Sequence, residues 1–255
     1  MIIYFSATGN NKYLAKKIAE NTDENIISIV KCVKENIVDI KIPENESLGI
    51  IVPTYFWGLP SIVDEFLSKT KFYINDDTYV YAIASYGTTT GYALGYIKDY
   101  LKKQGINVNA EYEVKMTDTW TVMFDLTDKD MINEEQEYVE IQLKNIIPKI
   151  INKESNNFNN NIFNKIGSMF AGKMYDKQRK CNHLHVLDNC ISCSKCSDGC
   201  PINAIEMMDG KPVWTVDRCV MCLRCLHRCP TFSIQYTDKT IYHGQYTNPH
   251  IDILD

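Results

Sequence analysis

The sequence lacks a long hydrophobic run. None of its apolar stretches approaches the roughly 20 residues that a membrane-crossing helix needs. The first residues, Met1 to Phe5, also lack the basic start, the longer apolar core and the cleavage site of a secretory signal peptide. We therefore expect no membrane span and no signal peptide.

Positive charge is scarce and unevenly placed. The chain has 27 Lys and Arg against 32 Asp and Glu, a formal net charge of −5. Residues 1–150 carry 15 basic and 22 acidic side chains, residues 151–180 carry 6 and 2, and residues 181–255 carry 6 and 8. A nucleic-acid-binding surface needs a clustered basic face. This distribution does not indicate one, so we expect no nucleic-acid partner.

Histidine and glycine-rich motifs are scarce too. The five His are too few and too scattered for a di-iron oxygen-reducing site. The chain has no G-x-G-x-x-G motif, which argues against a nicotinamide-dependent reductase. His183 and His185 lie near Cys181 without the spacing of a recognised metal site. We assign no role to these three residues or to Cys32.

Cysteine, by contrast, is patterned. Eight of the ten Cys fall into two runs of the form C-x-x-C-x-x-C-x-x-x-C-P. In bacterial ferredoxins, each such run gives three thiolates to one 4Fe–4S cluster, and its fourth Cys binds the other cluster. Two zinc ribbons or a disulfide framework are the rival interpretations. Neither predicts two copies of this spacing with Pro after both.

This spacing assigns the cluster ligands crosswise. One cluster takes Cys190, Cys193, Cys196 and Cys229, and the other takes Cys219, Cys222, Cys225 and Cys200. The Pro after each fourth Cys fixes φ and ends the local helix, which turns that thiolate away from its own run. Free thiolates and exposed clusters require a reducing compartment, so we expect a cytoplasmic location, and we expect low oxygen as well.

Residues 186–236 resemble a two-cluster bacterial ferredoxin. The resemblance implies a small α+β domain with two similar halves. Each half would contain a short strand, a cluster loop, a one-turn helix and a return strand. A domain this small buries little apolar surface by itself, so its clusters would also serve as its core.

A possible anion site follows the first predicted strand. The buried-strand pattern of residues 2–5 leads into Ser6-Ala7-Thr8-Gly9-Asn10-Asn11, and a helical pattern follows. Backbone N–H groups at a helix start, with hydroxyl and amide side chains, can bind a phosphate. The loop has no Walker Lys, which suits FMN. The alternative is an ordinary turn whose Ser and Thr cap the helix.

Two later loops support a flavin site. They follow the predicted strands 48–53 and 78–85, and open α/β sheets bind ligands at the carboxyl ends of their strands. Trp57 is the candidate stacking platform for an isoalloxazine ring, with Tyr86 as its partner; a core plug is the alternative for Trp57. Trp120 and Phe124 would either wall this pocket or cover the core. The candidate FMN contacts are Ser6, Thr8, Gly9, Asn10, Asn11, Pro53, Thr54, Tyr55, Phe56, Trp57, Gly58, Ser85, Tyr86, Gly87 and Thr88.

Residues 1–150 resemble a short-chain flavodoxin, and the whole chain is similar to bacterial flavodoxin–ferredoxin fusion proteins. The resemblance implies an α/β fold with a doubly wound, five-stranded parallel sheet that binds FMN. Flavodoxins usually carry Thr or Ser where this chain has Asn11. The expected strands are 2–5, 26–30, 48–53, 78–85 and 108–115, and the expected helices are 10–20, 61–69, 90–104 and 134–150, the last with an acidic first turn at Glu134, Glu135 and Glu137.

We expect four segments. They are a flavodoxin-like domain (1–151), a linker with an amphipathic helix (152–180), a two-cluster ferredoxin domain (181–236) and a tail that folds back (237–255). Residues 152–160 are Asn-rich and are expected to be flexible. The helix carries an apolar stripe of Ile162, Ile166, Phe170 and Met174, which should pack against one or both domains. A basic amphipathic membrane anchor is the alternative.

The chain is expected to be an electron-transfer protein with one FMN and two 4Fe–4S clusters, serving redox partner proteins. A flavin-dependent reductase of a small acceptor, such as a quinone, a nitro compound or oxygen, is the alternative. The sequence leaves open the donor, the acceptor, the direction of electron flow and the oligomeric state.

Overall fold

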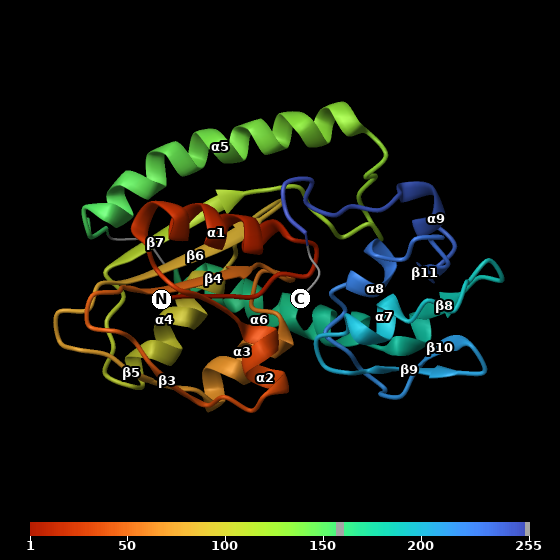
Figure 1. Cartoon of the computed structure of the whole chain (residues 1–255), viewed down its shortest axis with the longest axis horizontal. Coiled ribbons are helices and arrows are strands. Elements are labelled where there is room, and N and C mark those ends of the chain that lie inside the picture. Colours follow the sequence, from red (N-terminus) through yellow and green to blue (C-terminus); the bar gives the residue numbers. More distant parts are fainter. Residues whose placement is uncertain (157–160, 253–255) are drawn as a thin grey trace.

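A five-stranded parallel sheet forms the centre of the N-terminal half (Figure 1). The computed structural model describes residues 1–156 and 161–252. The strand order is β2-β1-β4-β6-β7, and Ile3 pairs with both Ile27 and Ile50. This sheet confirms the expected flavodoxin-like topology. Its strands are β1 (Ile2–Tyr4), β2 (Ile26–Ser28), β4 (Leu48–Pro53), β6 (Val80–Tyr86) and β7 (Ala110–Lys115).

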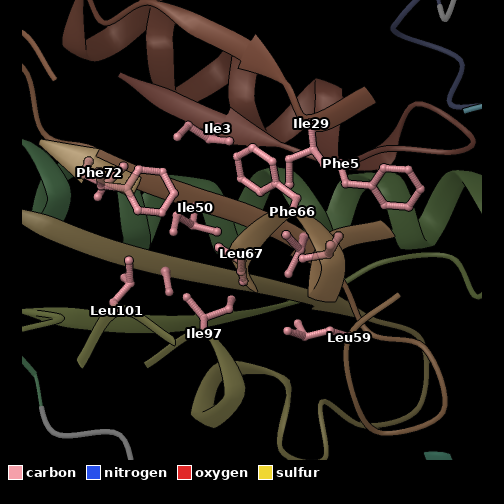
Figure 2. Close-up of a cluster of buried hydrophobic side chains, with 14 of the residues drawn as sticks. Ile3, Phe5, Ile29, Ile50, Leu59, Phe66, Leu67, Phe72, Ile97 and Leu101 are labelled. Carbon is pink, nitrogen blue, oxygen red and sulfur yellow. The ribbon is translucent and has the colours of Figure 1, made fainter. Parts of the chain in front are cut away.

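Helices cover both faces of the sheet because its strands are apolar on both sides. Helices α1 (Asn10–Thr22) and α5 (Lys129–Ile151) cover one face. Helices α3 (Ser61–Lys69) and α4 (Ala93–Lys102) cover the other. Figure 2 shows this second core, where α3 and α4 side chains meet the sheet. Two packed layers hold the strand ends, and hence their loops, in fixed positions.

Three local features differ from the expectation. Residue 29 begins a short helix, α2 (Ile29–Lys34), because the Ser28 hydroxyl caps it by accepting from the Val30 N–H at 3.2 Å. Strands β3 (Asp39–Lys41) and β5 (Lys71–Tyr73) form an unforeseen parallel pair. Helix α5 starts at Lys129 rather than 134, since the Asp128 carboxylate caps it. Glu134, Glu135 and Glu137 therefore lie beyond its first turn.

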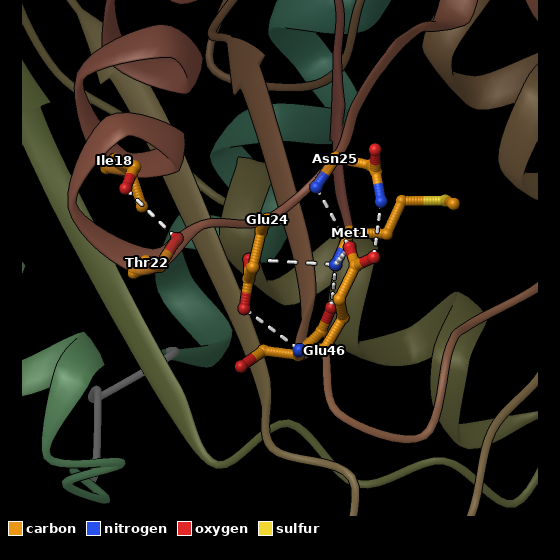
Figure 3. Close-up of polar contacts among 7 residues, drawn as sticks. Met1, Ile18, Thr22, Glu24, Asn25 and Glu46 are labelled. Atoms are coloured by element: carbon orange, nitrogen blue, oxygen red, sulfur yellow. Dashed lines mark hydrogen bonds and ion pairs between the residues drawn. The ribbon is translucent and has the colours of Figure 1, made fainter.

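Polar contacts fix the start of β1 (Figure 3). The Met1 amino group lies 2.7 Å from a Glu46 carboxylate oxygen and 3.6 Å from one of Glu24. Asn25 donates its backbone N–H to the same Glu46 at 3.0 Å. These contacts join the segment before β2 to the segment before β4, so β1 is held between its two neighbours.

The C-terminal part has the two similar halves that the ferredoxin resemblance implied. Strand β8 (Leu184–Val186) pairs with β11 (Ile234–Tyr236), and β9 (Ile205–Met208) pairs with β10 (Lys211–Trp214), both antiparallel. One-turn helices α7 (Lys195–Asp198) and α8 (Arg224–His227) follow the two cluster loops. A 3-10 turn, η1 (Cys181–His183), precedes β8, and α9 (Thr240–His243) lies in the tail.

Helix α6 (Ile162–Gln178) joins the two halves, and its orientation contradicts the expected packing. Its buried residues are Ser168 and Tyr175. The apolar stripe faces outward, and the exposed fractions of its four side chains range from 47% to 65%. Gly167 has no side chain, so α6 can approach the Trp57 ring closely. The face of α6 that carries Gly167 and Ser168 therefore packs inward. The exposed side chains are Ile162, Phe163, Ile166, Met169, Phe170 and Met174.

The segment expected to be a flexible linker is described only in part. Asn156 is fixed to β7, because its side-chain amide exchanges two hydrogen bonds with the Glu111 backbone, at 2.9 and 3.0 Å. Residues 157–160 lie outside the described residues. Within residues 1–156 and 161–252, no helix combines the length and apolar character needed to cross a bilayer.

Candidate flavin site and cysteine clusters

A cavity of about 350 Å³ opens at the carboxyl ends of the parallel strands. The loops after β1, β4, β6 and β7 form most of its wall. All of the candidate FMN contacts line it except Gly9 and Gly58. The structure thus brings together three loops that the sequence singled out separately. Their contacts with FMN remain a prediction.

The first loop leads directly into α1. The Gly9 N–H donates to the Ser6 hydroxyl at 3.1 Å, and Gly9 itself has a left-handed φ of 100°. The Asn11 side chain turns back and donates to the Phe5 carbonyl at 2.9 Å. Asn11, which stands where flavodoxins usually carry Thr or Ser, therefore uses its amide nitrogen to hold the backbone of its own loop.

A cation from the C-terminal half reaches this loop. The Arg224 guanidinium donates from Nη1 to the Ser6 carbonyl at 3.2 Å, and Arg224 is buried. The loop sequence contains no basic residue, so no local pattern predicts this charge. Only the folding of α8 against the loop brings the two together, across 218 positions of the chain.

The Trp57 loop is tightly constrained. Phe56 and Trp57 both have left-handed φ values, 46° and 63°. The Trp57 carbonyl accepts from the Tyr92 N–H at 2.9 Å and from the Ser168 hydroxyl of α6. A Cβ at Gly91 would lie 2.3 Å from the Trp57 Cβ, so only glycine fits there. The Trp57 side chain lines the cavity and is 48% exposed, whereas a core plug would be buried.

The loop after β7 completes the cavity wall. Thr117, Asp118 and Thr119 line the cavity and were missed by the sequence analysis. These residues could have been predicted to line the cavity, because their loop also follows a predicted parallel strand. Trp120 and Phe124, which the sequence left open, both line the cavity.

Asp118 is the acidic residue of this wall. Its carboxylate accepts from the Trp120 N–H at 3.1 Å, and the Thr88 hydroxyl lies 3.5 Å from its other oxygen. Burial raises the pKa of the Asp118 carboxyl above its usual value despite these two contacts. The carboxyl therefore keeps its proton to a higher pH than an exposed Asp would.

The eight patterned cysteines gather in two groups, in the crossed combination. Cys200, Cys219, Cys222 and Cys225 line one small cavity; we call them the proximal set. Cys190, Cys193, Cys196 and Cys229 line another; we call them the distal set. Each set contains three residues of one run and the fourth residue of the other. The structure therefore places the cysteines as the ferredoxin spacing predicts, while their role as ligands stays a prediction.

Each set supplies four thiols, the number of ligands that a 4Fe–4S cluster takes. Among the described residues, no three His, Cys, Asp or Glu side chains converge closely enough for one metal ion. In a 4Fe–4S cluster each thiolate binds a different iron, so its sulfurs lie farther apart than the ligands of one zinc. Burial raises the pKa of the Cys222 thiol to about 12, so cluster binding would displace a proton there.

The proximal set adjoins the flavin cavity directly. Met221, Cys222 and Leu223 line that cavity, and Cys222 also lines the cavity of its own set. Val220 is buried in the same core as α3 and α4. The Tyr175 hydroxyl of α6 donates to the Val220 carbonyl at 2.6 Å and accepts from the Ser61 N–H at 3.2 Å. The two halves thus share one core at this point.

The cavity offers unused polar atoms. Asn11 Oδ1 and Thr54 Oγ1 are buried and have no hydrogen-bond partner among the described residues. Both residues line the cavity. Buried polar atoms are rarely left unpaired, and a pocket of this volume suits a small ligand. Because FMN carries phosphate, hydroxyl and ring polar groups, these residues fit it.

Comparison with protein families agrees with the geometry. The flavodoxin domain family matches residues 1–137, and the 4Fe-4S dicluster domain family matches residues 189–234. The chain belongs to the flavodoxin domain family and joins that domain to a 4Fe–4S dicluster domain. It is a flavin and iron–sulfur electron-transfer protein. A search of curated proteins found no match.

Solved structures are similar to part of this chain. A candidate flavoprotein from Bacteroides uniformis shares 19% identity over 48% of this chain and 93% of its own, with a TM-score of 0.34. Rubredoxin oxygen:oxidoreductase from Desulfovibrio gigas shares 17% identity over 56% of this chain and 35% of its own, with a TM-score of 0.33. The Trp repressor binding protein of Bacillus subtilis shares 14% identity over 55% of this chain and 94% of its own, with a TM-score of 0.33. With TM-scores this low, no functional conclusion follows from these structures.

Proposed function

We propose that the protein passes electrons between a redox partner protein and FMN through two 4Fe–4S clusters arranged in series. The distal set would hold the cluster that meets the partner, and the proximal set the cluster beside the flavin. The observation that carries this order is the position of Cys222, which lines both its own cavity and the flavin cavity. Because electrons tunnel only over short distances, a shared wall favours direct transfer.

The surface around the distal set supports its role as the partner contact. Cys193 is exposed, whereas Cys200 of the proximal set is buried. Ile191, also in the distal cavity wall, is 61% exposed. An exposed ligand lets a partner approach one cluster without entering the junction of the two halves.

The cofactors supply the redox chemistry and the protein supplies their binding and spacing. A bound flavin takes up two electrons and can exchange them singly, which matches it to one-electron clusters. The loop from Ser6 to Asn11 would hold the phosphate, and Trp57 and Tyr86 would flank the ring. The N-terminus of α1 favours the negative charge of a phosphate at this loop.

Cofactor content is the first test. Protein purified without oxygen should contain about eight iron and eight sulfide per chain, the content of two 4Fe–4S clusters, together with one FMN. Stoichiometric zinc without sulfide would contradict the cluster assignment.

The second test follows electrons inside the chain. After a one-electron donor reduces the clusters, the flavin should be reduced at a rate that does not depend on protein concentration. Cys222→Ala removes a proximal ligand and should slow this step strongly while the distal cluster keeps its spectrum. Cys32→Ala, the same substitution at a buried cysteine outside both sets, should leave the rate unchanged. A rate proportional to protein concentration would mean that electrons pass between molecules instead.

The position of Asp118 in the cavity wall supports a second candidate function, the reduction of a small acceptor at the flavin. Reducing a quinone or a nitro compound consumes protons as well as electrons. A carboxyl with a raised pKa in the cavity wall can donate one. Turnover of such acceptors by the wild type, and its loss in Asp118→Asn with cluster-to-flavin transfer intact, would identify a reductase.

A further inference from the structure

A closed ring of hydrogen bonds lies behind the loop that leads into α1. Asn10 Oδ1 accepts from the Tyr246 hydroxyl at 2.7 Å and from Asn248 Nδ2 at 3.1 Å. Gln136 of α5 completes the ring: its Nε2 donates to the Tyr246 hydroxyl at 2.9 Å, and its Oε1 accepts from Asn248 at 3.3 Å. All four side chains are buried.

The ring determines how the Asn10 amide is oriented. Two donors converge on Oδ1, so only the oxygen of the amide fits on that side. The amide nitrogen must then lie on the other side, where Nδ2 is 3.5 Å from the Thr117 carbonyl oxygen. Both Asn10 and Thr117 line the flavin cavity. An N–H donor is therefore left for a ligand in the cavity.

The tail also holds the backbone of the loop. The Asn248 N–H donates to the Thr8 carbonyl at 2.8 Å. Asn248 Oδ1 in turn accepts from the His250 N–H at 3.0 Å, so the Asn248 side chain is itself fixed. Thr8 is the residue before Gly9, where the chain turns into α1. The tail thus fixes one backbone group and one side chain of the same loop.

We propose that the tail residues Tyr246 and Asn248 are part of the phosphate subsite of the flavin site, where they position Asn10 as a donor to a phosphate monoester. This inference rests on the proposed binding of FMN. Neither tail residue needs to touch the ligand. They act through Asn10 and Thr8, and are therefore positioning residues.

Riboflavin provides the test, because it has the ring and the ribityl chain of FMN without the phosphate. Flavin-depleted protein with its clusters retained is titrated with each flavin, and binding is followed by the change in flavin fluorescence. Tyr246→Phe removes one donor to Asn10 and should weaken FMN binding about tenfold, the usual effect of one buried hydrogen bond. Riboflavin binding should stay as in the wild type.

Two further variants sharpen the result. Asn248→Ala removes the second donor but keeps the backbone N–H, and should also weaken FMN selectively. Tyr242→Phe makes the same change at a tail tyrosine that is 77% exposed, and should affect neither flavin. Equal weakening of FMN and riboflavin by Tyr246→Phe would overturn the inference, as would unchanged FMN binding in both ring variants.

The wild type separates this inference from the proposed function. Equal affinity for FMN and riboflavin would mean that the loop is not a phosphate subsite, so the inference would fail while flavin-based electron transfer stood. Failure to bind either flavin would overturn both.

Discussion

At the scale of single residues, Asp118 shows how the cavity wall affects stability. Its carboxyl is partly buried beside Gly87, where a Cβ would lie 2.3 Å from the Asp118 side chain. Desolvation raises its pKa more than the contacts with Trp120 and Thr88 lower it. Because its pKa is higher in the folded than in the unfolded state, the carboxylate costs stability at neutral pH.

We therefore expect Asp118→Asn to raise the free energy of unfolding at pH 7, by about 1 kcal/mol or less because the amide retains part of the hydrogen bonding. The gain should shrink as the pH falls through the folded-state pKa and vanish near the unfolded-state value of about 3.9. Urea unfolding at several pH values measures it.

Asp125→Asn is the matched control, since hydrogen bonds from Thr127 lower the pKa of the exposed Asp125 carboxyl. Its pH dependence should have the opposite sign. A gain for Asp118→Asn that is the same at every pH would contradict the assigned cause.

At the scale of elements, α6 is held by its polar and small residues. The Tyr175 hydroxyl bridges Ser61 and Val220, and Ser168 contacts the Trp57 carbonyl. The side chains of the apolar stripe are exposed instead. The residues that fix α6 between the two halves are therefore not the ones that its hydrophobic pattern singled out.

Two variants should separate the exposed face of α6 from its buried face. Replacing both Ile166 and Phe170 with Ser should change the free energy of unfolding by no more than about 0.5 kcal/mol, as is usual at exposed sites. It should also leave cluster-to-flavin transfer unchanged. Tyr175→Phe should cost about 1–2 kcal/mol because it leaves the Ser61 N–H and the Val220 carbonyl without a buried partner. Urea unfolding compares the two, and a larger loss in the double variant would mean that the stripe is covered after all.

Elements with strong local signals were predicted well. Strand 48–53 and helix 61–69 occur as predicted, because a continuous apolar run and a preceding Pro are local features. The face of α6 that packs inward could not be predicted from such local features. Hydrophobic periodicity marks large side chains, whereas the close approach to Trp57 depends on Gly167.

At the scale of the whole molecule, some parts of the site lie where the N-terminal and C-terminal halves meet. These parts could not be predicted from the sequence, whereas parts formed by local patterns could. The cysteine spacing and three cavity loops are local patterns and were visible. Arg224 beside Ser6, and Tyr246 beside Asn10, join positions more than 200 residues apart. No periodicity or motif links such positions, so only the packing of the C-terminal half against the sheet reveals them.

The crossed cysteine sets predict a distinctive loss on mutation. Cys200→Ala should damage the proximal cluster, although Cys200 belongs to the first run. The electron paramagnetic resonance spectrum of the Cys200→Ala variant should therefore resemble that of the Cys222→Ala variant. Cys229→Ala should instead resemble Cys193→Ala, since both remove distal ligands. If each variant lost the cluster of its own run, the crossed assignment would be wrong.

The ring behind the first loop has a consequence for the order of events during synthesis. Asn10 leaves the ribosome well before its partners Tyr246 and Asn248, which follow 236 and 238 positions later. The sheet and its helices can form while the chain is still growing, since domains generally fold as units from the N-terminus. The loop can take its final form only after the tail has been translated and has docked. Flavin loading would then require a chain translated past Asn248, and a polypeptide truncated before residue 246 would fold its sheet without gaining full affinity for the cofactor.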